Sequence, residues 1–154
     1  MQYRRYKPED FAALYTIEEA CFEPPLRFGR GLMRQLAASP RGAAWIAEEN
    51  GRMVGFAAVE WSEEAGAAAA YIQTIEVVAE ARGRGVGGEL LRRVEDSARA
   101  AGAEWIWLHV DQENPAAIRL YENHGYTKQG REEHYYARNR AALVYARSLA
   151  ASSA

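Results

Sequence analysis

The sequence predicts a single α/β domain with a mixed sheet, and three observations support that fold class. Apolar residues recur with helical spacing in two early segments, and the period then changes to alternation. Residues 68–110 have the pattern strand, loop, helix and strand, which indicates a right-handed crossover between parallel strands. Antiparallel hairpins are expected on both sides of this crossover, so the sheet combines both strand directions.

The first half of the chain is expected to hold a short strand, two helices and a hairpin. The expected segments are a strand at 2–6, helices at 9–22 and 29–38, and strands at 43–48 and 52–61. Pro24-Pro25 end the first helix, on whose apolar face Glu18 also falls. Glu49-Asn50-Gly51 is a hairpin turn signal. Residues 63–67 are expected to form a flexible connection to the crossover.

The second half contains the clearer helix signals. The expected segments are strands at 68–78 and 104–110, a helix from Val86 to Ala101, a helix after Asn114, and a closing hairpin at 126–136 and 141–148. Asn114 is a good N-cap, Pro115 takes the first helical position, and Gly125 lies just past the helix end. Trp107 and His109 share one face of their strand. Residues 151–154 are expected to fray.

Length and composition narrow the function classes. A chain of 154 residues is the size of one domain. The formal net charge of −2 argues against a nucleic-acid or anionic-membrane binder. The single cysteine, Cys21, cannot form an internal disulfide, and no metal-ligand set surrounds it. No signal segment and no apolar run of about 18 residues are visible, so the expected location is cytoplasmic.

A glycine-rich loop between a strand and a helix predicts an anion site. The loop consists of Arg82, Gly83, Arg84, Gly85, Val86, Gly87 and Gly88. Glycine lets backbone N–H groups approach a ligand closely, and the helix N-terminus and two arginines add positive potential. These features suit a pyrophosphate or a 3′-phosphate. A tight turn would explain one or two of the glycines, but not four of them beside two arginines.

The loop alone leaves more than one nucleotide ligand open. A P-loop needs Gly-Lys-Ser/Thr, whereas this chain has Gly88-Glu89 there. A Rossmann dinucleotide site is a closer rival, because Gly83-x-Gly85-x-x-Gly88 fits its fingerprint and Asp111 ends the next strand. Against it, the pattern occurs once, late in a short chain, without a second mononucleotide-binding half.

Two motifs together point to one family. The first motif, Gln/Arg-x-x-Gly-x-Gly/Ala, is matched by Arg82-Gly83-Arg84-Gly85-Val86-Gly87. The second motif, Asn-x-x-Ala-x-x-Leu-Tyr-x-x-x-Gly-Phe/Tyr, is matched by Asn114-Pro-Ala-Ala117-Ile-Arg-Leu120-Tyr121-Glu-Asn-His-Gly125-Tyr126. In this order, separated by a strand, they resemble the two signatures of the GNAT superfamily of N-acetyltransferases. The resemblance implies a mixed, mostly antiparallel sheet with a central splayed parallel strand pair and flanking helices.

The resemblance also implies acetyl-CoA as the cofactor and a set of residues that bind it. The pantetheine arm of acetyl-CoA would lie along the backbone of residues 75–77, and its pyrophosphate would lie on the glycine-rich loop. The implied cofactor-binding residues are Ile75, Val77, Arg82, Gly83, Arg84, Gly85, Val86, Gly87, Gly88, Asn114, Ala117 and Tyr121.

Three residues are candidates for the chemistry. Tyr121 matches the family tyrosine that donates a proton to the leaving sulfur. Leu108-His109-Val110 resembles a subset of N-terminal acetyltransferases in which the histidine pairs with a tyrosine on the preceding sheet strand, and Tyr71 matches that position. His109 and Tyr71 would then deprotonate the amine through an ordered water, since an imidazole suits general-base work. The alternative for each of the three is ordinary packing.

The acceptor is the least determined part. Phe22, Pro25, Phe28, Tyr135 and Tyr136 resemble the two loops that clamp a peptide N-terminus in the protein-acetylating branch. The acidic run Asp111-Gln112-Glu113 departs from the Arg-x-Ser that is common in relatives, and it favours cationic amines. The leading hypothesis is a protein or peptide N-terminus as acceptor. A small amine, or a non-catalytic acetyl-CoA-binding module, are the alternatives.

Overall fold

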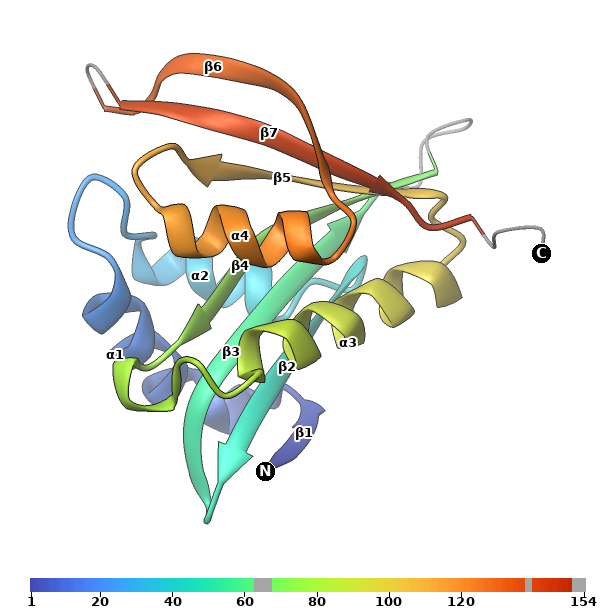
Figure 1. Cartoon of the computed structure of the whole chain (residues 1–154). Helices are drawn as coiled ribbons and strands as arrows, with labels where there is room; N and C mark the ends of the chain where they lie inside the picture. Colours follow the sequence, from blue (N-terminus) through green and yellow to red (C-terminus); the bar gives the residue numbers. More distant parts are fainter. Residues whose placement is uncertain (63–67, 138–139, 151–154) are drawn as a thin grey trace.

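The protein is a twisted sheet covered by helices on both faces (Figure 1). The computed structural model describes residues 1–62, 68–137 and 140–150. The strands are β1 (Gln2–Arg5), β2 (Gly42–Glu49), β3 (Arg52–Trp61), β4 (Ala69–Val77), β5 (Trp105–Asp111), β6 (Thr127–Ala137) and β7 (Arg140–Ser148). The helices are α1 (Phe11–Cys21), α2 (Arg30–Ala37), α3 (Val86–Ala100) and α4 (Pro115–Asn123), with short 3-10 turns η1 (Pro8–Asp10) and η2 (Ala79–Ala81).

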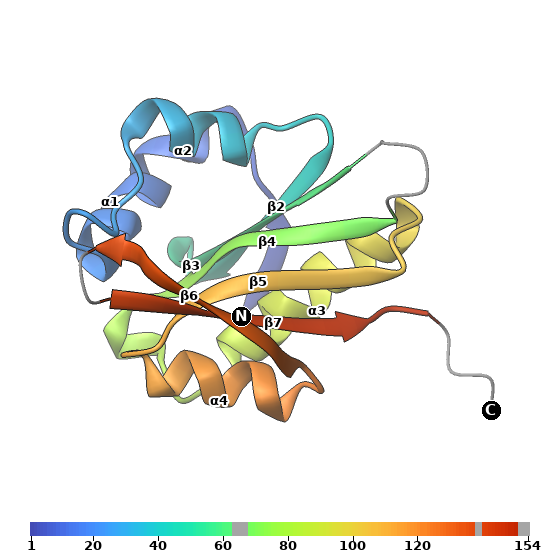
Figure 2. The same cartoon turned by 90° about the horizontal axis from the view of Figure 1, so that it is seen from above.

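The strand order is β1-β2-β3-β4-β5-β7-β6. Neighbouring strands are antiparallel except for β4 and β5, which are parallel and joined by the α3 crossover. This confirms the predicted mixed, mostly antiparallel sheet with one central parallel pair. Viewed from above, α1 and α2 cover one face of the sheet and α3 and α4 lie on the other (Figure 2).

Local turn and cap chemistry explains where several elements begin and end. Asn50 and Gly51 have φ angles of 53° and 78°, as a tight hairpin turn requires. The Asn114 side chain accepts a hydrogen bond from Ala117 N–H at 3.2 Å, and Gly125 has a φ of 85° just past α4. These three predicted boundaries are confirmed. The predictions for residues 63–67 and 151–154 lie outside the described residues.

Each face of the sheet has its own apolar core. On one face Leu90, Leu91 and Val94 of α3 pack in the larger cluster. On the other face the smaller cluster includes Leu14 of α1 and Met33 of α2, and these two side chains are fully buried. Most of the apolar residues at helical spacing therefore face the sheet, but Leu32 of α2, which was expected on the apolar face, is 48% exposed. Within the described residues, none of the helices is both long and apolar enough to cross a membrane.

The parallel pair is short. β4 and β5 are paired over only three positions, Ala69 with Trp105, Ala70 with Ile106 and Tyr71 with Trp107. Beyond this ladder both strands run on, and their later residues line a common cavity. The splay that the resemblance implied is therefore present, and it opens at the carboxyl ends of the two strands.

A bulge in β4 changes which residues face that cavity. Ala58 of β3 pairs with Thr74, and the next residue, Val59, pairs with Ile72, so Gln73 has no partner across the ladder. In a regular strand neighbouring side chains point to opposite faces. Here the consecutive residues Gln73, Thr74 and Ile75 all line the cavity.

Candidate active site

A groove runs from the glycine-rich loop to the gap between β4 and β5. Its cavity volume is about 480 Å³. Its wall combines the loop glycines, the end of β4, the end of α1 and one face of α4. The predicted cofactor-binding residues that line it are Ile75, Val77, Arg82, Gly83, Gly85, Val86, Gly87, Gly88, Asn114 and Ala117. The structure thus brings together ten residues that were chosen from three separate segments, namely β4, the glycine-rich loop and the Asn114 motif.

The start of α3 offers backbone donors to this groove. The first intrahelical hydrogen bond runs from Glu89 N–H to Gly85 O, so the N–H groups of Val86, Gly87 and Gly88 precede it. Gly83 and Gly85 have φ angles of 77° and 82°, and a Cβ built on either would meet no atom within 4 Å. The loop is therefore open toward the groove, with amide donors and a helix dipole directed at an anion.

The two loop arginines differ in position. Arg82 lines the groove, and its Nε donates to Val77 O at 2.9 Å. Arg84 instead forms an ion pair with Glu49 of β2 and is absent from the groove wall. The structure therefore places one of the two predicted cations at the groove. The helix N-terminus and Arg82 carry the positive potential there.

We expect Gly85→Glu to reduce the affinity for acetyl-CoA by at least about 100-fold. The new side chain adds a left-handed backbone strain of about 1–2 kcal/mol and places a carboxylate where the anion binds. Gly51→Glu is the matched control, because Gly51 also has a positive φ but lies in the β2–β3 turn. Calorimetric titration with acetyl-CoA should show normal affinity for this control. Equal losses in both variants would contradict an anion site at Gly85.

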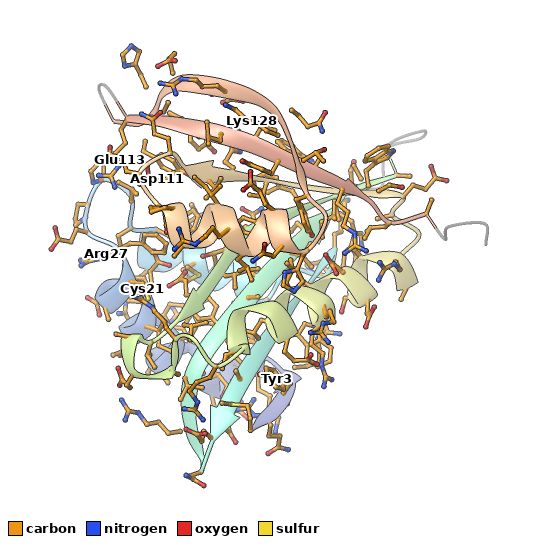
Figure 3. All side chains as sticks on the ribbon, viewed as in Figure 1. Tyr3, Cys21, Arg27, Asp111, Glu113 and Lys128 are labelled. Atoms are coloured by element: carbon orange, nitrogen blue, oxygen red, sulfur yellow. The ribbon has the colours of Figure 1, made fainter. Side chains whose placement is uncertain are left out.

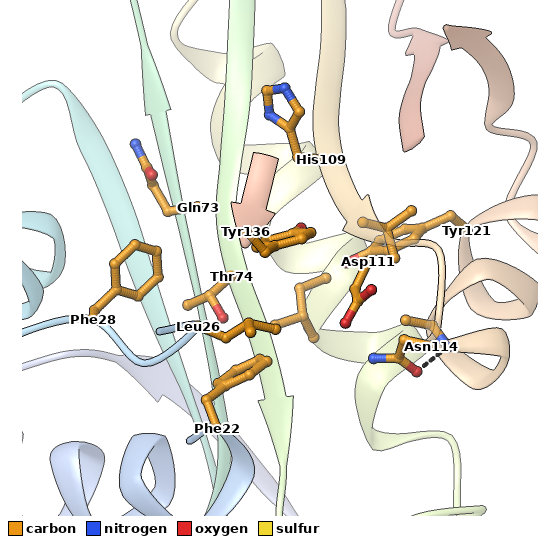
Figure 4. A pocket seen from close by; sticks show the side chains of 13 residues that line it. Phe22, Leu26, Phe28, Gln73, Thr74, His109, Asp111, Asn114, Tyr121 and Tyr136 are labelled. Atoms are coloured by element: carbon orange, nitrogen blue, oxygen red, sulfur yellow. Dashed lines mark hydrogen bonds between the residues drawn. The ribbon is translucent and has the colours of Figure 1, made fainter. Parts of the chain in front are cut away.

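A narrower pocket continues from the groove between β4 and β5 (Figure 4). Its cavity volume is about 110 Å³. It shares Phe22, Ile75, Asn114 and Ala117 with the groove, so the two spaces are continuous. The other residues of its wall are Leu26, Phe28, Gln73, Thr74, His109, Val110, Asp111, Tyr121 and Tyr136. The pocket is thus mostly apolar, with a few polar groups that converge on it.

His109 and Tyr71 form the hydrogen-bonded pair that the sequence predicted. The Tyr71 hydroxyl lies 2.7 Å from Nδ1 of His109. Burial, and next the neighbouring Tyr135 phenol, raise the pKa of Tyr71 well above its usual range. Tyr71 therefore keeps its proton, which it can donate to Nδ1 when the ring carries its own proton on Nε2. Trp107 lies edge-on to Tyr71 with a centroid distance of 4.6 Å, which fixes the phenol in this position.

A bulge in β6 brings two adjacent tyrosines to the same side. β6 leaves its register with β7 between Glu132 and Ala137, and His134 has a φ of 56°. Tyr135 stacks on the His109 ring with centroids 4.2 Å apart, while Tyr136 lines the pocket. In a regular strand only one of the two could face β5. Tyr135 thus covers the ring of His109, and Tyr136 forms part of the pocket wall.

Tyr121 reaches the pocket from α4, one helical turn after Ala117, as the motif predicted. It is buried, and burial alone raises the pKa of its phenol above the usual value. A phenol with a raised pKa stays protonated throughout the neutral and mildly alkaline range. Tyr121 can therefore act as a proton donor to a group in the pocket.

Two buried acids stand beside the pocket. Glu18 of α1 and Glu76 of β4 are 0% and 3% exposed. Phe28 N–H donates to Oε2 of Glu18 at 3.0 Å, and the Thr74 hydroxyl donates to Oε2 of Glu76 at 2.6 Å. Burial, and next the neighbouring Glu18, raise the pKa of Glu76 well above its usual range. The pair therefore holds a proton, and Glu18 ties the pocket loop at Phe28 to α1.

A third cavity opens beside the pocket and is more polar. Asp111, Glu113 and Glu23 line it together with Arg140, whose guanidinium lies 2.6 Å from Asp111 Oδ2. Cys21 lies on the opposite wall of the same cavity, and Figure 3 labels it with Asp111 and Glu113 along one edge of the molecule. Arg140 pairs with Asp111 and also lies 3.5 Å from Oε2 of Glu113, so among the described carboxylates that line this cavity only Glu23 is not paired with Arg140.

Only some of the predicted acceptor-binding residues lie at the pocket. Phe22, Phe28 and Tyr136 line the pocket, and Tyr135 covers His109. Pro25 is exposed and is absent from the pocket wall. Leu26, Gln73 and Val110 line the pocket but were not predicted. Leu26 lies between the predicted Phe22 and Phe28, so the aromatic spacing of this loop was the signal that could have identified it.

Comparisons with known proteins agree on one family. The family model described as "Acetyltransferase (GNAT) family" matches residues 11–126. The chain is 38% identical over 87 residues to streptothricin acetyltransferase of Streptomyces lavendulae, covering 56% of this chain and 45% of that protein. It is 33% identical over 113 residues to N-alpha-acetyltransferase RimI of Mycobacterium tuberculosis, covering 73% of this chain and 66% of that protein. The chain thus spans less than two thirds of the length of either relative.

The fold agrees with the same family. The crystal structure of the ribosomal-protein-S18-alanine N-acetyltransferase from Escherichia coli superimposes with a TM-score of 0.84. The superposition covers 99% of this chain and 97% of that one, at 23% sequence identity. At this identity the likeness shows a common fold, and it carries no information on the acceptor.

Proposed function

Since the chain belongs to the GNAT family of acetyltransferases, whose acetyl donor is acetyl-CoA, we propose that it is a cytoplasmic enzyme that acetylates the α-amine of a protein or peptide N-terminus. One observation carries this proposal. The Tyr71–His109 hydrogen bond stands at the wall of a narrow, mostly apolar pocket that continues from the cofactor groove. A base is thus available where an amine entering the pocket would meet the acetyl donor.

The residues of the groove fit acetyl-CoA. When bound, acetyl-CoA supplies the acetyl group as a thioester. The open glycines at the start of α3 leave room for a pyrophosphate, and Arg82 adds a cation. Ile75 and Val77 of β4 and Ala117 and Leu120 of α4 form a less polar passage from there to the pocket. The groove thus combines an anion-binding end with an apolar end.

The side chains of the pocket divide the proton transfers between them. Tyr71 and His109 accept the proton of the attacking amine, and Tyr121 donates a proton to the thiolate that leaves. The ordinary pKa of an α-amine is about 8 and that of a lysine about 10.4. At neutral pH an N-terminal amine is therefore deprotonated more easily by the base than a lysine is. This difference favours an N-terminus over a lysine side chain as the acceptor.

The shape of the site also favours a peptide. β4 and β5 separate beside the pocket, so their backbone groups at this edge can pair with an extended chain. Phe22, Phe28 and Tyr136 surround the space for the first side chain. The similarity to the RimI N-alpha-acetyltransferase agrees with this choice.

The test is thiol release from acetyl-CoA with a panel of acceptors. Peptides with a free N-terminus are expected to be used at least about 100-fold more efficiently, as kcat/KM, than polyamines, amino acids or aminoglycosides. The same peptides with a blocked N-terminus and an internal lysine are the control, and they should be inert. Turnover of small amines alone would contradict the proposal.

A small cationic amine is the second candidate. Glu23 lines the polar cavity beside the pocket, where its carboxylate can attract a positive charge. The similarity to streptothricin acetyltransferase is consistent with this alternative. The acceptor panel distinguishes the two candidates directly.

A further inference from the structure

His109 has a second ring nitrogen that the Tyr71 pair does not use. Nε2 is buried and makes no hydrogen bond within the described part of the chain. Oε1 of Glu132 lies 3.1 Å from it, close enough for an ion pair but without the alignment of a hydrogen bond. The Glu132 side chain is half exposed, so its carboxylate has room to rotate relative to Nε2. Nε2 is also covered, so it is not available to an acceptor in the pocket.

The tautomer of His109 follows from its partners. When Tyr71 donates to Nδ1, the neutral ring carries its proton on Nε2. The Glu132 carboxylate is then the charged group beside that nitrogen, at 3.1 Å. Tyr135 stacks on the ring face with an interplanar angle of 13°, which limits rotation of the imidazole. The ring is thus held between a phenol at one nitrogen and a carboxylate at the other.

We infer that Glu132 is a positioning residue of this enzyme, which orients His109 and stabilises the imidazolium that forms when the acceptor amine is deprotonated. The inference rests on the proposed role of the Tyr71–His109 pair as the base. It extends that pair to a line of three groups, Tyr71, His109 and Glu132, contributed by β4, β5 and β6. A base that is oriented by a third group is a recurring arrangement in catalytic sites.

The proton transfers balance in this arrangement. The amine N–H bond breaks and its proton passes to a bridging water, which gives one of its own protons to the Tyr71 oxygen, while the original Tyr71 proton moves to Nδ1 of His109. Tyr71 stays neutral and the ring becomes an imidazolium, with N–H groups at both nitrogens. The positive charge then lies beside the Glu132 carboxylate. No further reactant is needed, and the ring returns to neutral when it releases the proton to water.

Few other titratable groups face this ring. β4 contributes Tyr71, and β6 contributes Tyr135 along with Glu132. β5 contributes Trp107, and β7 places Val144 opposite His109, neither of which titrates. Among the described residues, Glu132 is therefore the one carboxylate in contact with the ring.

Glu132→Gln tests the inference, because it keeps the length and the acceptor oxygen and removes only the charge. The plateau of kcat/KM is expected to fall about two- to fivefold, which is the range for a half-exposed ion pair. The acid limb of the pH profile is expected to move to lower pH, since the charged ring loses its partner. About 1 M salt should reduce both differences by screening.

Glu133→Gln is the matched control. Glu133 is the next residue of β6, and its carboxylate pairs with Arg131 rather than with His109. This variant should leave the plateau and the acid limb unchanged. If Glu132 served only to hold β6 in place, Glu132→Gln would lower the plateau without moving the limb. That outcome, or a limb that moves equally in both variants, would overturn the inference.

A second measurement separates this inference from the acceptor proposal. Proton NMR titration of the imidazole signals follows His109 in the enzyme alone, without donor or acceptor. The chain has three histidines, so His109→Gln assigns the signal. The midpoint should lie lower in Glu132→Gln than in the parent, whichever amine proves to be the acceptor. An unchanged midpoint contradicts the role of Glu132 even where peptides are acetylated.

Discussion

Replacing Tyr121 with phenylalanine is expected to lower kcat by about 100- to 1,000-fold and to leave acetyl-CoA affinity within about threefold. The substitution removes the proton donor and keeps the ring that fills the space between α4 and β5. Proton transfer by a positioned side chain contributes about 10²- to 10⁴-fold to a rate. Burial raises the pKa of the Tyr121 phenol, so the phenol is protonated over the whole assay range. Lowering the pH slightly therefore cannot compensate for the loss of this proton donor. Steady-state thiol release and calorimetric titration measure the two quantities.

Tyr145→Phe is a suitable control for this experiment. Tyr145 is also buried, but its hydroxyl donates to Glu122 at 2.8 Å and it is absent from the pocket wall. Its loss should cost about 1 kcal/mol of stability and leave kcat unchanged. A Tyr121→Phe enzyme with nearly normal kcat would show that the thiolate takes its proton from another group.

The effect of replacing Glu76 on the free energy of unfolding is expected to depend on the substituent. Glu76→Ala should lower the free energy of unfolding by about 3 kcal/mol, because it leaves Glu18 buried without its partner. Glu76→Gln should be tolerated, because an amide can donate to Glu18 in place of the shared proton. Oε1 of each acid lacks a hydrogen-bond partner in the described chain, and one proton between the two carboxyl groups would satisfy both. Urea titration of the variants measures the difference.

The raised pKa of Glu76 also predicts how the free energy of unfolding changes with pH. Burial and the neighbouring Glu18 raise the pKa of Glu76 in the native state, whereas the unfolded side chain titrates near its ordinary value of about 4.3. Between these two values the native state binds the extra proton, so the free energy of unfolding falls as pH rises. The slope from this group is at most about 1.4 kcal/mol per pH unit. Glu76→Gln should remove that slope and be more stable than the parent at alkaline pH. Parallel stability curves for the two proteins would show that no proton is shared.

Features set by a few neighbouring residues could be predicted from the sequence. The Asn50-Gly51 turn, the Asn114 cap and the glycines before α3 depend on local backbone chemistry, and all three are where they were expected. The Tyr71–His109 contact was predicted from a motif on each of two neighbouring strands. The parallel register that places these strands side by side is short but lies next to both residues.

Features that depend on strand register could not be predicted in this way. Strict alternation puts only one of Tyr135 and Tyr136 on the pocket side, and the bulge of β6 overrides it. Alternation likewise predicts that Gln73 and Ile75 share a face, but Thr74 lines the pocket with them beside the bulge of β4. Arg84 was expected to bind the anion, but its ion-pair partner Glu49 is distant in sequence. Glu18 was placed on an apolar helix face, and nothing in the sequence pattern linked it to Glu76.

The unpaired stretch of β6 between Glu132 and Ala137 has a consequence for the way this enzyme can diverge. Tyr135, which covers His109, and Tyr136, which lines the pocket, both lie in this stretch. Losing or gaining a single codon here would exchange those positions without disturbing the groove at α3. Acceptor preference could therefore change through short insertions and deletions in one hairpin, while the donor-binding half of the protein stays the same.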